Sequence, residues 1–277
     1  MAMCPIMSRL LPGSLLSAGL LLALLPATAW AQGERDLCAD RPGLGTPACT
    51  MEPGRVVLEL GLGDWMRERD GSMQVDTIIA GDALARLGLT EHLEAQIGWT
   101  GYGYVRTRDR TTGMVDRTSG MGDVALALRR NLQNPNGSGV SIALMPCATL
   151  PVGGHAIGAG DWAAGLLAPV TVELNAGMGL ELTPEVDAAV DEDGSGRHLA
   201  YGSVAGLTFD LFDSLSSAAE FSAFRDEDPS GHATQMLAGL SLGWQPSDDL
   251  QLDIGANLGL NHDSPDTQFY IGVAQRF

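Results

Sequence analysis

Alternation of apolar and polar residues over long segments is the feature of this sequence that most constrains its fold. From position 250 to 261, leucine, isoleucine or alanine occupies every even position, and glutamine, aspartate, glycine or asparagine occupies every odd one. Successive side chains of a β-strand point to opposite faces, so this pattern predicts a strand with one apolar and one polar face. The segment also reaches the roughly 9–11 residues that a tilted strand needs to cross a bilayer.

Twelve such segments follow residue 53, joined alternately by five short turns and six longer polar stretches. They lie at 54–66, 73–86, 92–106, 120–130, 139–152, 162–173, 177–189, 198–209, 215–225, 232–244, 250–261 and 266–277. An even strand number with this alternation of connections is the rule for bacterial outer-membrane barrels. The sequence therefore predicts an all-β protein, in which residues 54–277 form a transmembrane, antiparallel, up-and-down β-barrel of about 12 strands.

A secreted β-sandwich or a soluble lipocalin-like barrel is the main alternative fold. In those folds the apolar face packs into a core of bulky side chains, and sandwich strands are commonly only about 5–6 residues long. Here the polar face is rich in glycine with isolated charges, as a wet lumen requires. An aromatic content of 5% argues against a membrane barrel, because such barrels carry aromatic girdles. The strand length and the polar face nevertheless favour the membrane barrel.

The first 31 residues have the composition of an export signal. Arg9 gives the only positive charge, an uncharged run follows from Leu10 to Trp30, and Ala29-Trp30-Ala31 matches the small-x-small cleavage pattern. A retained transmembrane helix is the alternative, but two prolines and a glycine interrupt the run. We expect residues 1–31 to be removed during export, residues 32–53 to form a periplasmic N-terminal segment, and the barrel to reside in the outer membrane of a Gram-negative bacterium.

Cysteine spacing predicts a disulfide in the N-terminal segment. Cys38 and Cys49 bracket a stretch rich in proline and glycine, which a disulfide could close in an oxidising compartment. No second close cysteine or histidine pair accompanies them, so a zinc site is not expected. The acidic run from Asp191 to Gly194 lacks the ligand spacing of a calcium loop. The sequence thus predicts no metal and no cofactor.

The charge balance bears on possible partners. The chain has 34 Asp+Glu against 16 Lys+Arg, and a nucleic-acid partner would require concentrated positive charge. Nucleic acid is therefore not expected as a partner.

Several short motifs resemble a known family. Asp40-Arg41-Pro42-Gly43, Gly54 at the first strand, Gly120-Met121-Gly122-Asp123 at the fourth, and Arg86–Glu94 at the second hairpin are similar to the outer-membrane channel family named for the MetA pathway of phenol degradation. The resemblance spans about residues 38–277. It implies an outer-membrane transporter or channel, without identifying phenol as the substrate.

The chain end suggests further partners. Phe277, with Ile271 and Val273 on the same face, is similar to the C-terminal signal that the barrel assembly machinery reads. We expect that machinery, outer-membrane lipid, lipopolysaccharide and a small solute as partners.

The parity of the strands predicts which charges line the lumen. If Phe277 faces lipid, the charged residues of the opposite parity face inward: Glu59, Asp76, Arg86, Glu94, Arg106, Asp123, Arg129, Glu181, Glu220 and Asp253. They could line a water-filled pore and bias which solutes enter. Alternatively, they could pair across a narrow lumen and hold it shut, with Arg86 and Glu94, which flank one turn, as a structural pair.

The resulting functional prediction is a passive outer-membrane channel for small solutes, without catalysis. A structural barrel with a closed lumen is the first alternative. A lipid hydrolase similar to outer-membrane phospholipase A is the second, and it would need a serine nucleophile with a histidine base. The five histidines fall in turns, loops or strand ends without a serine-centred motif, so an enzyme is not expected.

Overall fold

The computed structural model describes residues 35–154, 156–175 and 177–277, and the predicted export signal at 1–31 lies outside this range. The described residues form 14 β-strands in one antiparallel sheet. No helix among them is long and apolar enough to cross a bilayer. The strands are β1 (Val56–Asp70), β2 (Met73–Thr90), β3 (Leu93–Asp109), β4 (Val115–Gly120), β5 (Val124–Gln133), β6 (Val140–Leu150), β7 (Ala163–Leu167), β8 (Val170–Asn175), β9 (Met178–Val190), β10 (Arg197–Phe212), β11 (Leu215–Asp226), β12 (Ala233–Ser247), β13 (Leu250–Gly259) and β14 (Thr267–Arg276).

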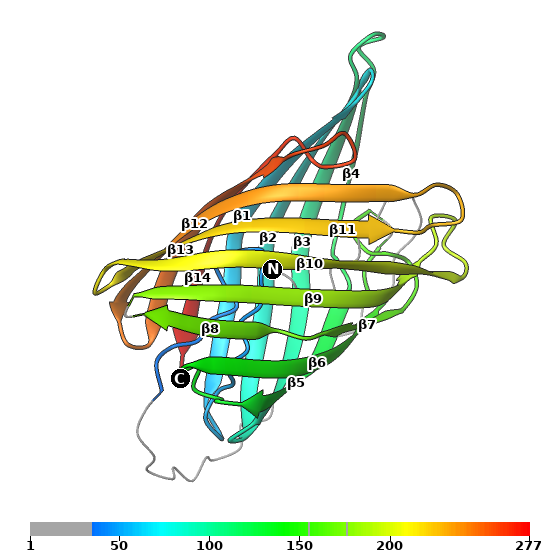
Figure 1. The fold of residues 1–277 in the computed structure, drawn as a ribbon. Helices are drawn as coiled ribbons and strands as arrows, with labels where there is room; N and C mark the ends of the chain where they lie inside the picture. The colour runs from blue at the N-terminus through cyan, green and yellow to red at the C-terminus, as the bar shows by residue number, and fades with distance from the viewer. Residues whose placement is uncertain (1–34, 155, 176) are drawn as a thin grey trace.

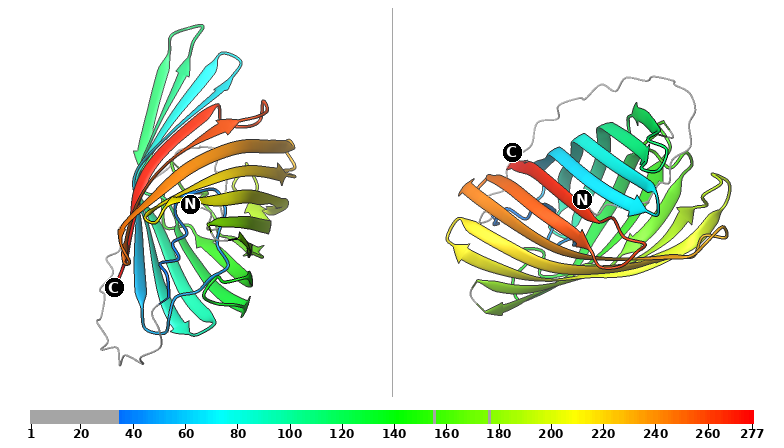
Figure 2. Two further views of the ribbon diagram at one scale, coloured as in Figure 1. Left: turned by 60° about the vertical axis from the view of Figure 1, so that its left-hand side comes forward. Right: turned by 90° about the horizontal axis from the view of Figure 1, so that it is seen from above.

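The sheet closes on itself into a barrel (Figures 1 and 2). Strands β4 and β5 both pair with β3, and β7 and β8 both lie between β6 and β9, so each couple occupies one position in the wall. Pro169 lies at the break between β7 and β8, where a residue without an N–H cannot continue the ladder. The prediction of a 12-stranded, antiparallel, up-and-down barrel is confirmed. Phe277 exchanges backbone hydrogen bonds with Val56 and closes the seam between β14 and β1.

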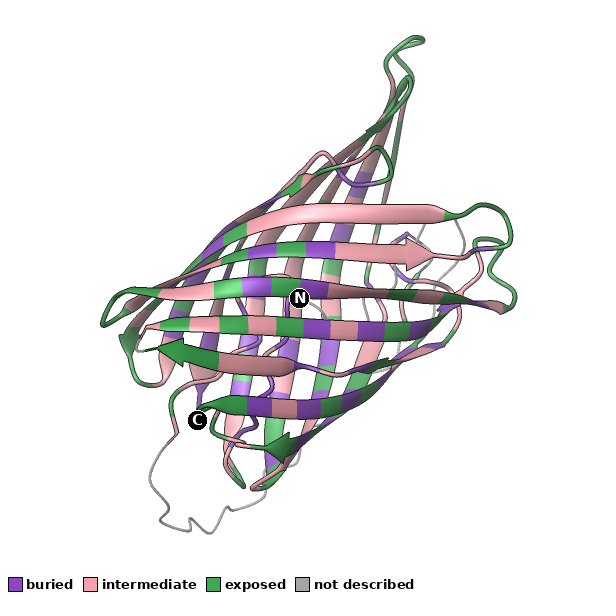
Figure 3. Cartoon of the chain, in the orientation of Figure 1, coloured by how far each residue is buried: buried purple, intermediate pink, exposed green. Residues whose placement is uncertain are grey.

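Buried and exposed residues alternate along the strands of the barrel (Figure 3). The exposed positions carry mainly large apolar side chains, and many of the buried ones are polar or charged. Along β13, Gln251, Asp253 and Asn257 are buried, whereas Ile254 and Leu258 are more than half exposed. A water-soluble protein rarely exposes so large an apolar surface, but a lipid-facing barrel requires it.

Aromatic side chains mark both ends of the outer face. At the end with the long loops, Trp65 stacks on Phe269 with ring centroids 5.9 Å apart. Tyr102, Trp162 and Tyr201 are also exposed toward this end, and Phe212, Trp244 and Phe277 are exposed toward the end with the short turns. The barrel therefore carries two aromatic levels despite its low aromatic content, as membrane interfaces favour.

Irregularities in β1, β2 and β3 reverse the faces of their outer parts. The register with β14 shifts between Gly61 and Gly63, and Gly81, which has a φ of +70°, and the opposing Gly101 leave a gap in the β2–β3 ladder. One extra residue in a strand moves every following side chain to the other face. Beyond this point β1–β4 project past the barrel as a sheet, which we call the outer extension (residues 64–80 and 102–120; Figures 1 and 2).

The N-terminal segment lies inside the barrel. Thr46, Ala48, Thr50 and Met51 are each at most 2% exposed. We call residues 36–53 the plug. The sequence predicts residues 32–53 as a periplasmic N-terminal segment and gives no indication that this segment enters the lumen. The plug has no strand partner, so its backbone groups must find hydrogen bonds elsewhere, and inward polar side chains of the wall supply them.

Candidate functional site

Five buried charged residues join the plug to the barrel wall. Arg86 lies at the centre, with its Nε 3.0 Å from Glu94 Oε1 and its Nη1 3.1 Å from Glu59 Oε1 and 2.9 Å from Asp40 Oδ1. Arg129 contacts the same Asp40 at 2.6 Å and Glu94 at 3.4 Å. Asp40 comes from the plug, and the other four come from β1, β2, β3 and β5. We call these five residues the ion network.

The ion network also binds the backbone of the plug. Arg86 donates to the carbonyl oxygen of Cys38 at 2.6 Å, and Arg129 donates to that of Cys49 at 3.2 Å. Cys38 and Cys49 are joined by a disulfide, so both arginines contact the bridged positions. Glu59 accepts from the N–H groups of residues 40 and 41, and Glu94 accepts from that of residue 51. Each of the four wall residues in the ion network therefore binds both the wall and the plug, and each would lose its contacts with the plug if the plug left the lumen.

Arg41 forms a second anchor on the far side of the lumen. Its guanidinium binds Asp253 in bidentate geometry, with distances of 3.1 and 2.8 Å, and both side chains are at most 6% exposed. Paired N–H···O bonds of this kind are among the stronger charged contacts in proteins. Gln251 donates to the Arg41 carbonyl oxygen. Gly272 lies directly under the guanidinium, where any Cβ would collide with it.

A third anchor lies between the first two. Glu220 accepts hydrogen bonds from the N–H groups of Leu44 and Gly45 at 2.9 and 2.8 Å. Thr46 donates to the Thr183 hydroxyl at 3.0 Å and accepts from it in return at 3.1 Å. Glu181 packs against Gly45, where a Cβ would collide with its carboxylate. The plug is thus bound on several sides of the lumen.

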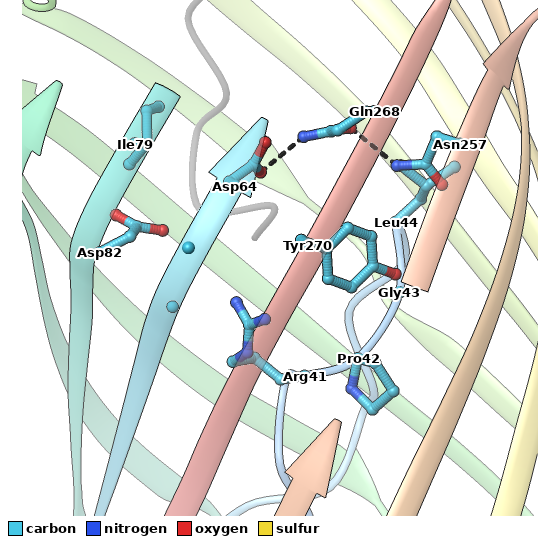
Figure 4. Close-up of a pocket in the computed structure, with 12 residues that line it drawn as sticks. Arg41, Pro42, Gly43, Leu44, Asp64, Ile79, Asp82, Asn257, Gln268 and Tyr270 are labelled. Carbon is cyan, nitrogen blue, oxygen red and sulfur yellow. Dashed lines mark hydrogen bonds between the residues drawn. The ribbon is translucent and has the colours of Figure 1, made fainter. Parts of the chain in front are cut away.

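A polar pocket opens above the plug (Figure 4). Residues 41–44 form its floor, and Asp64, Asp82, Asn257, Gln268 and Tyr270 belong to its wall. Gln268 donates to Asp64 at 2.7 Å and accepts from Asn257 at 2.8 Å. Asp82 accepts from Thr100 at 2.9 Å. Among the described residues neither aspartate forms a salt bridge within 4 Å, and each carboxylate instead accepts a hydrogen bond from a neutral side chain.

Carboxyl groups outnumber guanidinium groups on the described inner face of the barrel. The inward guanidinium groups of Arg41, Arg86 and Arg129 are each bound to carboxylates. Further carboxylates on the inner face form no salt bridge with an arginine in the part of the chain that the structure describes: Asp64, Asp82, Glu181, Glu185 and Glu220.

The structure places eight of the ten predicted lumen residues inside: Glu59, Arg86, Glu94, Asp123, Arg129, Glu181, Glu220 and Asp253. Asp123 holds the loop after β6 by accepting from the N–H groups of Gly153 at 3.0 Å and Ala159 at 2.7 Å. The remaining seven contact the plug or one another around it.

Asp76 and Arg106 correct the prediction, because they lie on the outer face. Asp76 is bound to Arg67 at 2.7 Å, and the Arg67 guanidinium lies over the ring of Trp65, which stacks on the lipid-facing Phe269. Arg106 is opposite Asp76 in the register. The irregularities at Gly61–Gly63, Gly81 and Gly101 lie between these residues and the barrel proper, and they invert the parity.

Sequence reasoning missed Asp40, Arg41, Asp64 and Asp82. Asp82 has the same parity as Arg86 and lies on the same side of the Gly81 irregularity, so the alternation could have identified it. Asp64 faces inward only because of the bulge before it. The plug residues belong to a segment with no alternation, and their roles depend on contacts with strands far away in the sequence.

A cluster at the outer rim could hold a cation. Asp191, His198 and Asp228 place their donor atoms within 4.8 Å of one another. His198 Nδ1 lies 2.9 Å from Asp191 and 3.4 Å from Asp228. Burial acts to raise the pKa of Asp228, but hydrogen bonds from Ser230 and from the Glu192 N–H outweigh it and lower that pKa below its usual value. The His198 ring already lies next to both carboxylates, so we assign no metal.

A closed 12-stranded barrel with an apolar exterior, a charged lumen and a chain segment folded into it defines a porin-like outer-membrane β-barrel protein. The model of the family described as "Putative MetA-pathway of phenol degradation" matches residues 39–277. The protein belongs to this family. No curated protein sequence matches the chain.

Solved structures share the fold. The NanC porin has a TM-score of 0.51 at 8% identity, covering 79% of this chain and 98% of the porin. The translocator domain of the autotransporter NalP from Neisseria meningitidis has a TM-score of 0.49 at 16% identity, covering 86% and 90%. The KdgM porin in complex with oligogalacturonate has a TM-score of 0.49 at 7% identity, covering 80% and 99%. At 8% identity the similarity to the NanC porin shows the barrel fold alone.

Proposed function

We propose that this protein is a passive channel for small solutes in the outer membrane of a Gram-negative bacterium, with the plug closing the lumen in the described conformation. The observation that carries the proposal is the pocket above the plug, where Asp64 and Asp82 face the lumen without salt bridges among the described residues. A barrel with only a structural role gains nothing from two carboxylates without salt bridges at this position, since burying a carboxylate without a cationic partner is unfavourable.

The lumen charge supports a solute class within this function. Every inward guanidinium described above is bound to a carboxylate, and several carboxylates remain. We propose that small cationic or neutral polar solutes pass more readily than anions.

The function involves no chemical step. Among the described histidines only His198 is buried, and its ring nitrogens lie next to Asp191, Asp226 and Asp228 rather than a serine hydroxyl. Phe277, which closes the seam with β1, is proposed to be the signal for the assembly machinery.

Planar-bilayer recording tests the proposal. Purified protein that shows different gel mobility before and after boiling is inserted from detergent, in a gradient of potassium chloride. We expect discrete conductance steps and a reversal potential on the cation-selective side. Correctly folded protein that produces no steps, even after prolonged recording at high voltage, would make the closed structural barrel the better description.

Removal of the two pocket carboxylates is expected to reduce this selectivity. In Asp64→Asn/Asp82→Asn the cation-to-anion permeability ratio should fall about two- to threefold, because the wall next to the passing ion loses two charges. Asp213→Asn serves as the control, since this exposed aspartate lies in the turn between β10 and β11. An equal change in both variants would show that surface charge, not the pocket, sets the selectivity.

A further inference from the structure

The outer face of the outer extension carries a concentration of arginine. Arg67 stacks over Trp65 with its guanidinium carbon 4.9 Å from the ring centroid, and Trp65 in turn stacks on Phe269, which is 53% exposed on the lipid side. This contact shows that the face continues the lipid-facing surface of the barrel. Strand alternation and register place five arginines on it: Arg67, Arg69, Arg106, Arg108 and Arg117.

Few negative charges accompany these arginines. Asp76 binds both Arg67, at 2.7 Å, and Arg106, at 3.4 Å, and Asp266 lies 3.7 Å from Arg69. Arg108 and Arg117 are exposed, and within the described residues neither guanidinium group has a hydrogen bond or an ion pair. The whole chain has 34 acidic residues and only 16 basic ones, so an arginine-rich face departs strongly from its average composition.

The pairing of the strands is unfavourable without a counter-charge. Arg106 lies directly opposite Arg117 in the β3–β4 register, and like charges at opposed positions destabilise a sheet. Asp76, which lies 3.4 Å from Arg106 and also binds Arg67, offsets part of this repulsion, and a bound anion would offset the rest. Guanidinium groups favour phosphate in particular, because their planar fork can donate two parallel hydrogen bonds to its oxygens.

The position of the arginines along the strands, measured from the aromatic residues, indicates where that phosphate would lie. Arg67 is two residues beyond Trp65 in β1, and a strand rises about 3.3 Å per residue, so Arg67 lies about 7 Å beyond the aromatic level along the strand. Arg106 and Arg108 are four and six residues beyond the exposed Tyr102 in β3. This is the side of the long loops, which faces outward in bacterial outer-membrane barrels. The arginines thus occupy the headgroup level of the outer leaflet.

We propose that the outer face of the extension binds the phosphate groups of lipopolysaccharide. Arg67 and Arg106, fixed by Asp76, and the free guanidinium groups of Arg108 and Arg117 form the binding surface, while Trp65 and Phe269 contact the acyl region of the same lipid. A second copy of the chain does not fit this face, since two such surfaces would repel each other. The proposal depends on the orientation in the outer membrane and not on conduction through the lumen.

Binding of purified deep-rough lipopolysaccharide to the detergent-solubilised full chain tests the proposal. We expect Arg108→Gln/Arg117→Gln to bind fluorescently labelled lipopolysaccharide about five- to tenfold more weakly than the parent chain. Neither substituted guanidinium group has an intramolecular partner among the described residues, so the double variant should keep its heat-modifiable gel mobility. Arg130→Gln is the control, because Arg130 is also exposed on the outer face but lies at the short-turn end of β5. Its binding should change less than twofold.

A parallel experiment changes the lipid and keeps the parent chain. Enzymatically dephosphorylated lipopolysaccharide should bind the parent chain as weakly as intact lipopolysaccharide binds the double variant. Equal binding of intact and dephosphorylated lipid would overturn the proposal, as would an equal loss in the Arg130 control. Competition by phosphatidylglycerol vesicles at the same lipid phosphate concentration would also overturn it, since that result indicates attraction to any anionic surface.

Discussion

Replacement of Arg86 by methionine is expected to lower the free energy of unfolding by about 3–5 kcal/mol, because it leaves three buried carboxylates with one fewer cation between them. Asp40, Glu59 and Glu94 all lie within 3.1 Å of the Arg86 guanidinium, and the Arg86, Glu59 and Glu94 side chains are fully buried. Methionine preserves much of the volume, so the loss is mainly electrostatic. Urea unfolding in lipid vesicles, followed by tryptophan fluorescence, measures it.

Two further variants show whether the ion network is the cause. Arg130→Met removes a neighbouring arginine from the outer face of β5 and should change stability by less than about 0.5 kcal/mol, as exposed substitutions usually do. Asp40→Asn removes charge from the plug alone and should partly restore the stability of Arg86→Met when combined with it. Additive losses in the double variant would mean that the two residues do not interact.

Deletion of residues 36–50 is expected to give the largest functional change, an increase in mean conductance of at least about tenfold, because small barrels conduct only when their interior is not filled. The deletion removes Asp40, Arg41 and the loop that contacts Glu220, and it leaves every strand intact. Single-channel recording should show long-lived open levels in place of brief openings.

Reduction of the Cys38–Cys49 disulfide in the parent chain is the matched control for this deletion. The salt bridges and hydrogen bonds of the plug do not depend on the bond, so conductance should rise far less than in the deletion variant. A deletion variant that folds, as judged by gel mobility, and conducts no better than the parent would show that the plug is not the closing element.

Much of the architecture can be predicted from the alternation of apolar and polar residues. The twelve segments expected at 54–277 correspond to the twelve positions of the wall, because the period of two is imposed by lipid on one side and water on the other. The inward positions of Glu59, Arg86, Glu94 and Asp253 follow from the same parity. Near the centre of the barrel, pattern and structure agree.

The predictions from the sequence fail where the alternation of apolar and polar residues is interrupted or absent. The irregularities around Gly61–Gly63 and Gly81 insert residues that parity counting does not see, so Asp76 and Arg106 were assigned to the wrong face. The plug has neither helical nor strand periodicity, and its position depends on partners from seven different strands. No local feature of residues 32–53 encodes those partners.

The distribution of those partners has a consequence for biogenesis. The wall residues that contact the plug come from β1, β2, β3, β5, β9, β11 and β13, represented by Glu59, Arg86, Glu94, Arg129, Thr183, Glu220 and Asp253. This set exists only once nearly the whole sheet has formed. The plug precedes all the strands in the chain, yet its full set of contacts requires strands from nearly the whole wall, so it can reach its final place only late in folding.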